Sequence, residues 1–83
     1  MTKKMEKIME AYNSKMESVY DTYRFGYCDR KGCMQDLAKE CDRMETMLSN
    51  MFHFDLISEK DYTEVAGIPS KVRCKFFYKM LNL

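Results

Sequence analysis

The sequence predicts an all-α domain in which two long helices form an antiparallel hairpin and two shorter C-terminal helices follow. The chain of 83 residues holds one Pro and three Gly, too few for the frequent turns of a β-sandwich. It also holds nine Met, an unbranched residue that favours helices, and no Trp. Finally, apolar residues recur at alternating spacings of three and four along two long stretches, which is typical of helices that pack on other helices.

The first helix is expected over residues 2–25. Its apolar residues form one continuous stripe along the helix, the seam, and Ile8 and Tyr20 widen this seam on either flank. Gly26 is expected to end the helix, because glycine is the residue most often found just past a helix C-terminus. The seam itself is unbroken and consists of Met5, Met9, Tyr12, Met16, Val19 and Tyr23.

The second helix is expected over residues 30–53, with Asp29 as its N-cap. Met47 lies beside its seam, which consists of Met34, Leu37, Cys41, Met44, Leu48 and Met51. The connection between the two long helices is short, which favours a hairpin. The two seams then cover each other, or they cover a second copy of the chain.

Two shorter helices are expected over residues 59–66 and 69–81, packed across one end of the hairpin. Ser58 suits the N-cap of the first, with Ile57 and Tyr62 at the two positions of a hydrophobic staple. Pro69 suits the first turn of the second, since it lacks the N–H that would have no partner there. Residues 1–83 are expected to form a single domain.

Charge divides the chain into an acidic body and a basic end. Residues 1–64 carry ten Lys or Arg and thirteen Asp or Glu, whereas residues 65–83 carry four basic residues and no acidic one. The four are Lys71, Arg73, Lys75 and Lys79, a candidate patch for a nucleic acid or an acidic protein partner. With the short helix before it, this segment is similar in outline to a helix-turn-helix. A solvated helix C-terminus, whose dipole favours basic residues, is the other interpretation.

The sequence carries no pattern typical of a catalytic or metal site. Its carboxylates fall in pairs on outward helix faces, and the single histidine, His53, lies where a helix dipole favours it. The four cysteines are five, eight and thirty-three residues apart, without the paired ligands of a zinc site. The chain is therefore expected not to be an enzyme and to have no catalytic residue, metal or cofactor. A Cys28–Cys33 disulfide fits the connection sterically, but a reducing compartment disfavours it.

The expected location is cytoplasmic, without membrane contact. No stretch approaches the run of about 18 apolar residues that a membrane span needs. The basic residues near the N-terminus are not followed by the apolar region of a signal peptide.

The Met and Tyr content indicates a binding role, because both residues are enriched at protein interfaces. The candidate interface residues are Ile8, Tyr12, Tyr20, Tyr23, Tyr27 and Met47. We therefore expect a small non-catalytic protein–protein interaction module, a stoichiometric binder or inhibitor of another protein. Accessory proteins of phages and mobile elements are commonly of this size and composition.

A homodimer is also expected, since two seams and their flanking aromatic residues exceed what one hairpin can bury. Two alternatives stay open. One is a nucleic-acid-binding regulator that uses the basic C-terminal segment, and the other is a dimer cleft that holds a small anionic molecule.

Overall fold

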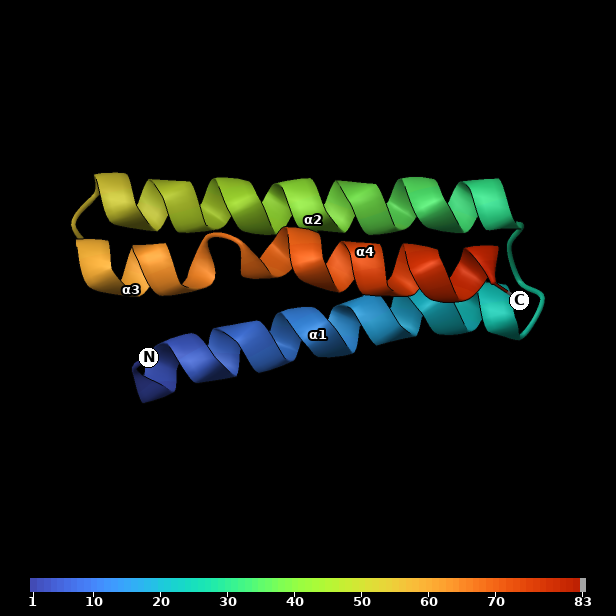
Figure 1. The fold of residues 1–83 in the computed structure, drawn as a ribbon, viewed down its shortest axis with the longest axis horizontal. Helices are drawn as coiled ribbons and strands as arrows, with labels where there is room; N and C mark the ends of the chain where they lie inside the picture. Colours follow the sequence, from blue (N-terminus) through green and yellow to red (C-terminus); the bar gives the residue numbers. More distant parts are fainter. Residues whose placement is uncertain (83) are drawn as a thin grey trace.

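The computed structural model describes residues 1–82, which form four helices and no strand. The prediction of an all-α chain is therefore confirmed. The helices are α1 (Lys3–Arg24), α2 (Arg30–His53), α3 (Glu59–Val65) and α4 (Ile68–Leu81). They run along the long axis of a molecule that measures 41 × 19 × 19 Å (Figure 1).

Polar side chains begin the first three helices. The Thr2 hydroxyl accepts a hydrogen bond from the Met5 N–H (3.2 Å), and the Asp29 carboxylate accepts one from the Gly32 N–H (2.7 Å). The Ser58 hydroxyl does the same for α3. Each cap gives a partner to an N–H group that the first turn of a helix cannot satisfy itself.

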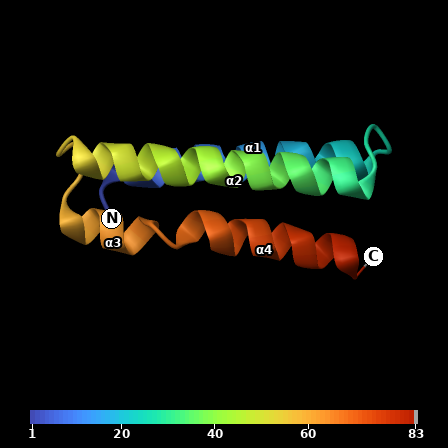
Figure 2. The ribbon, with the colours of Figure 1, turned by 90° about the horizontal axis from the view of Figure 1, so that it is seen from above.

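α1 and α2 lie side by side and antiparallel, and α4 packs lengthwise against both (Figures 1 and 2). α3 and α4 follow one another along the same line, so the last two helices return along the hairpin and do not cross its end. This corrects the expected placement. The break between them is local: Pro69 removes one helical N–H donor, but Ala66 and Gly67 keep right-handed helical conformations, so the chain does not change direction.

The core consists of two clusters, one towards each end of the bundle. Val65 of α3 and Ile57 before it complete the cluster that holds the start of α1 and the end of α2. At the other end, α4 contributes Phe76 and Met80, which are fully buried between the seams of the two long helices. Both seams therefore close within one chain, and the reason for expecting a dimer no longer applies.

Candidate functional site

The candidate site begins where α2 ends. Asp55 adopts a left-handed backbone conformation (φ 59°), and its N–H donates to the Phe52 carbonyl (3.1 Å). The Leu56 N–H donates to the Met51 carbonyl (2.8 Å). These two hydrogen bonds define a Schellman motif, in which the apolar side chains on either side of the helix end are brought into contact. The motif therefore turns Leu56 back towards Met51.

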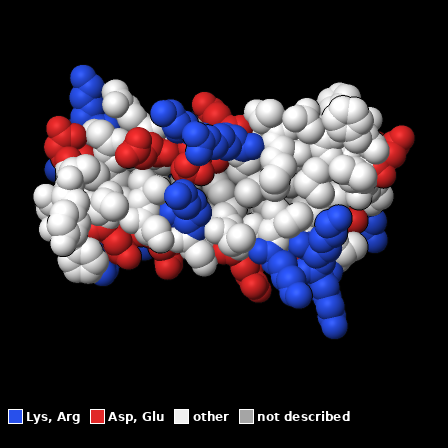
Figure 3. All heavy atoms as spheres, turned by 180° about the vertical axis from the view of Figure 1, so that it is seen from behind, with Lys and Arg blue, Asp and Glu red and all other residues white. Residues whose placement is uncertain are grey.

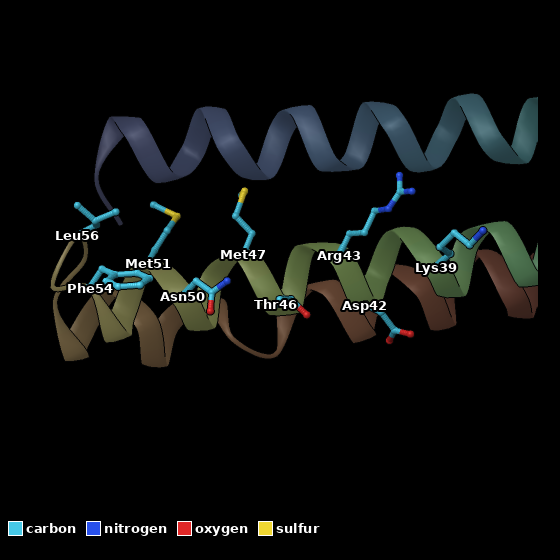
Figure 4. Close-up of a pocket in the computed structure, with 9 residues that line it drawn as sticks. All are labelled: Lys39, Asp42, Arg43, Thr46, Met47, Asn50, Met51, Phe54 and Leu56. Carbon is cyan, nitrogen blue, oxygen red and sulfur yellow. The ribbon is translucent and has the colours of Figure 1, made fainter.

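Leu56 and Met51 lie at one end of an open depression of about 550 Å³, which we call the α2 depression (Figure 4). In this view the side chains of Met47, Met51 and Arg43 project from α2 on the side of α1, whereas Asp42 points away. The depression is lined by Lys39, Asp42, Arg43, Thr46, Met47, Asn50, Met51, Phe54 and Leu56. It thus follows α2 over about four turns.

Large apolar side chains are exposed at this end of the molecule. Phe54 is 73% exposed, Leu56 62% and Met47 39%. Seen from behind, the half of the molecule that holds the start of α1 and the end of α2 carries a broad uncharged surface, with basic and acidic side chains around its borders (Figure 3). Large apolar groups that gather on a surface mark an interaction site more often than scattered ones do.

The charged residues of the α2 depression gather at the end away from Leu56. Lys39, Asp42 and Arg43 lie there. Arg43 forms an ion pair with Glu40 at 3.1 Å. Exposed ion pairs of this kind contribute little to stability. The depression is therefore apolar at one end and carries charges of both signs at the other.

Two of the residues expected at an interface lie at this site or beside it. Met47 lines the α2 depression, and Ile8 of α1 is half-buried against the same core cluster as Met51. Phe54 and Leu56 are the residues that sequence reasoning missed. The sequence offered only a weak signal for them: an aspartate just after a predicted helix adopts the left-handed conformation more readily than most residues, although glycine is the usual residue there.

The tyrosines do not gather at one surface. Tyr12 and Tyr20 are core residues, which corrects their assignment to an interface: the Tyr12 hydroxyl donates to the Pro69 carbonyl (2.9 Å), and the Tyr20 ring packs on Phe76. The physical reason is α4, which covers the flank of α1 that the hairpin alone would have left open. Tyr23 is half-buried, and Tyr27 is exposed in the α1–α2 connection, at the opposite end from the α2 depression.

The four basic residues of α4 do not form one patch. Lys71, Lys75 and Lys79 are spaced four apart on one face of the helix, and the Lys79 ammonium lies 5.2 Å from the centre of the Phe76 ring. Arg73 is about 200° around the helix from Lys71, and its Nε is buried without a hydrogen-bond partner. The basic patch expected from sequence is thus corrected to three lysines, none of which joins an ion pair within residues 1–82.

The outline of a helix-turn-helix is also corrected by the structure. That motif needs two helices that cross at roughly 90–120°. α3 and α4 instead follow one another in line, because Ala66 and Gly67 continue the helical course of the chain (Figure 2).

Several polar side chains of the described residues have partners within the fold. The His53 Nδ1 lies 2.7 Å from the Ser49 carbonyl oxygen, within the last turn of α2. Burial is the main cause that raises the pKa values of Tyr12, Cys33 and Cys41. Within residues 1–82, no three His, Cys, Asp or Glu side chains come together as metal ligands would.

Comparison with known proteins yields no relative: no family model, curated protein or solved structure matches the chain. None of the helices formed by residues 1–82 has the length and apolar character needed to cross a membrane.

Proposed function

We propose that this chain is a non-catalytic protein-binding module that acts stoichiometrically and docks on its partner through the α2 depression. The observation that carries the proposal is the exposure of Phe54, Leu56 and Met47 along one apolar surface. Burying such side chains against a partner removes apolar area from water, which is the main favourable term in protein association.

The occupant that fits best is an amphipathic helix of another protein. From Lys39 to Phe54 the depression extends about 22 Å along α2, the length of a helix of roughly 15 residues. Met47 and Met51 supply flexible thioether side chains, which adapt to the apolar face of a helix. The partner helix is expected to carry polar or charged residues at the end that meets Lys39, Asp42 and Arg43.

A protein that only occupies a surface affects its partner by blocking it. The proposal therefore includes an inhibitory role, such as accessory proteins of phages and mobile elements perform on host proteins. A second copy of the chain is the other occupant that the experiment distinguishes.

The experiment compares Phe54→Lys with Phe25→Lys, a matched variant in the α1–α2 connection. Phe25 is 64% exposed and lies at the opposite end of the molecule. A partner captured from cells that produce the chain should bind the wild type and Phe25→Lys in a one-to-one complex. We expect Phe54→Lys to weaken this complex at least about tenfold, as loss of an anchoring aromatic contact does. Equal affinities of the two variants would contradict the proposal.

The molar mass measured by light scattering distinguishes a second copy of the chain from a different protein as the occupant of the α2 depression. A second copy would give twice the chain mass of 10.0 kDa for the wild type and for Phe25→Lys, but the single mass for Phe54→Lys. A wild-type mass of 10.0 kDa together with a helical segment in the captured partner supports the proposed helix.

A second candidate function is contact with nucleic-acid phosphates through Lys71, Lys75 and Lys79. Their alignment on one face of α4, beside the exposed Tyr78, favours it. Three phosphate contacts predict that affinity for duplex DNA falls about 40-fold when salt rises from about 50 to about 200 mM. Fluorescence anisotropy measures this, and a Lys75→Glu variant should bind more weakly at low salt. Binding that does not change with salt would contradict this candidate.

A further inference from the structure

Two cysteines occupy the positions of a hydrophobic staple at the start of α2. Asp29 is the N-cap of the helix, so Cys28 directly precedes the cap and Cys33 is the fourth helical residue. In a staple the side chains at these two positions pack on one another. Here Cys28 packs against the core cluster to which Cys33 belongs.

Both thiols are held against the same turn of α1. The Cys28 Sγ lies 3.1 Å from the Thr22 Oγ1, and this hydroxyl donates to the Val19 carbonyl at 2.6 Å. The Cys33 Sγ donates to the same carbonyl at 3.5 Å. The Cys28 thiol thus contacts the Thr22 hydroxyl, and the Cys33 thiol contacts the Val19 carbonyl to which that hydroxyl is bonded.

The connection itself is fixed in place by the backbone. The N–H groups of Tyr27 and Cys28 both donate to the Thr22 carbonyl, at 2.7 and 3.2 Å. Cys28 therefore does not swing freely, and its distance from Cys33 is set by the fold. The neighbouring Cys28 thiol contributes, after burial, to raising the pKa of Cys33 to about 11.

We propose that Cys28 and Cys33 form an oxidisable dithiol, a modification site at which a small disulfide oxidant such as oxidised glutathione closes a bond between the two sulfurs. This inference does not depend on the proposed binding function. Cys28 is half-buried and reachable from solvent, whereas Cys33 is fully buried. The two residues thus have different roles in the reaction.

The reaction proceeds in two exchanges. The Cys28 thiolate attacks one sulfur of the oxidant, forms a mixed disulfide and expels one thiolate. Cys33, which gives up its proton in this step, then attacks the Cys28 sulfur and expels the second thiolate. The protons of the two cysteines end on the two leaving thiols, and two electrons pass from the cysteine pair to the oxidant.

The other two cysteines stay outside this pair. Cys41 is buried in α2 and lies 3.2 Å from a carboxylate oxygen of Glu45. Cys74 is exposed on α4 and can form only an adduct or a bond between chains. A Cys74→Ser variant therefore removes the competing reaction and keeps the fold.

The experiment equilibrates the Cys74→Ser protein in glutathione buffers, blocks free thiols in denaturant and digests with trypsin. Cleavage after Arg24, Arg30, Lys31 and Lys39 separates peptide 25–30, which holds Cys28, from peptide 32–39, which holds Cys33. We expect these two peptides to be joined by a disulfide in the oxidised protein. In the additional variant Cys33→Ser, we expect a glutathione adduct on Cys28 in place of the linkage.

Repeating the glutathione equilibration in concentrated urea tests whether the folded structure favours the Cys28–Cys33 disulfide. If the native structure holds the two thiols together, the folded protein should become half-oxidised with about tenfold less oxidised glutathione than the unfolded chain needs. The oxidised form should also unfold at a higher temperature than the reduced form. Equal or greater demand for oxidant in the folded protein, or adducts in place of the linkage, would overturn the proposal.

Discussion

Gly26 is a residue whose backbone the fold constrains tightly. Its left-handed conformation (φ 83°) lets the chain leave α1, and the Tyr27 N–H then donates to the Thr22 carbonyl. Because a Cβ in this conformation approaches the following carbonyl oxygen, we expect Gly26→Ala to reduce the free energy of unfolding by about 1–2 kcal/mol. Urea denaturation measures it.

Gly67 supplies the matched control. Its φ of −88° and ψ of −9° suit any residue, and an added Cβ would meet nothing within 4 Å. Gly67→Ala should therefore leave stability unchanged or raise it by roughly 0.4–1 kcal/mol, since it restricts the unfolded chain. If both variants lost the same stability, the positive φ of Gly26 would not be the cause.

At the residue scale, sequence reasoning found part of the candidate site. Met47 and Ile8 could be predicted because their places beside the seams follow from helical spacing alone. Tyr20 lies beside a seam too, yet α4 buries it. Leu56 was missed because its position depends on the left-handed Asp55, a backbone conformation that spacing does not encode. Whether a residue beside a seam is buried or exposed thus depends on α4, and the spacing of residues within α1 and α2 does not show where α4 packs.

At the scale of single elements, the sequence was most informative about where helices begin. α2 starts after Asp29 and α3 after Ser58, as the capping side chains predict. The direction of α3 and α4 could not be predicted, because a Gly–Ile–Pro segment is compatible with a turn as well as with a slightly interrupted helix. Only packing against α2 decides between the two.

The role of α4 as the element that closes the core gives a second prediction. Phe76 is fully buried between the long helices, and its ring centre lies 5.3 Å from that of Tyr20. Phe76→Ala removes this contact and leaves a cavity, at an expected cost of about 3–5 kcal/mol. Urea denaturation followed by circular dichroism measures the change.

Tyr78 is the control on the same helix. It is 71% exposed, so Tyr78→Ala should change the stability by no more than about 0.5 kcal/mol. Similar costs for the two variants would mean that α4 does not close the core in solution.

At the scale of the whole molecule, the two apolar seams explain why the chain folds as one unit. Met5, Met16, Leu37 and Leu48 are all but fully buried by other residues of the same chain. A hairpin alone would leave one side of these seams in water. The sequence could predict that the seams must be covered, but not that α4 covers them, because α4 has a weaker periodicity than the two long helices.

Burial of thiol and phenol groups throughout the core makes the whole molecule sensitive to alkali. Cys33 has a pKa of about 11 in the folded protein, against an ordinary value of 9.0, mainly because of burial, and burial also raises the pKa of Tyr12. Between pH 9 and 11 the unfolded chain has lost the Cys33 proton while the native protein keeps it. The unfolded state then binds fewer protons, so stability is present below pH 9 and falls as the pH rises.

We expect Cys33 alone to account for a loss of about 2 kcal/mol across this range. Urea midpoints at about pH 8 and about pH 10.5, in the presence of reductant, measure the fall for the wild type, Cys33→Ala and Cys74→Ser. Cys74 is exposed, so Cys74→Ser should keep the full pH dependence, whereas Cys33→Ala should show a smaller fall whatever its stability at neutral pH. Parallel falls in all three proteins would show that the thiol of Cys33 is not protected in the folded state.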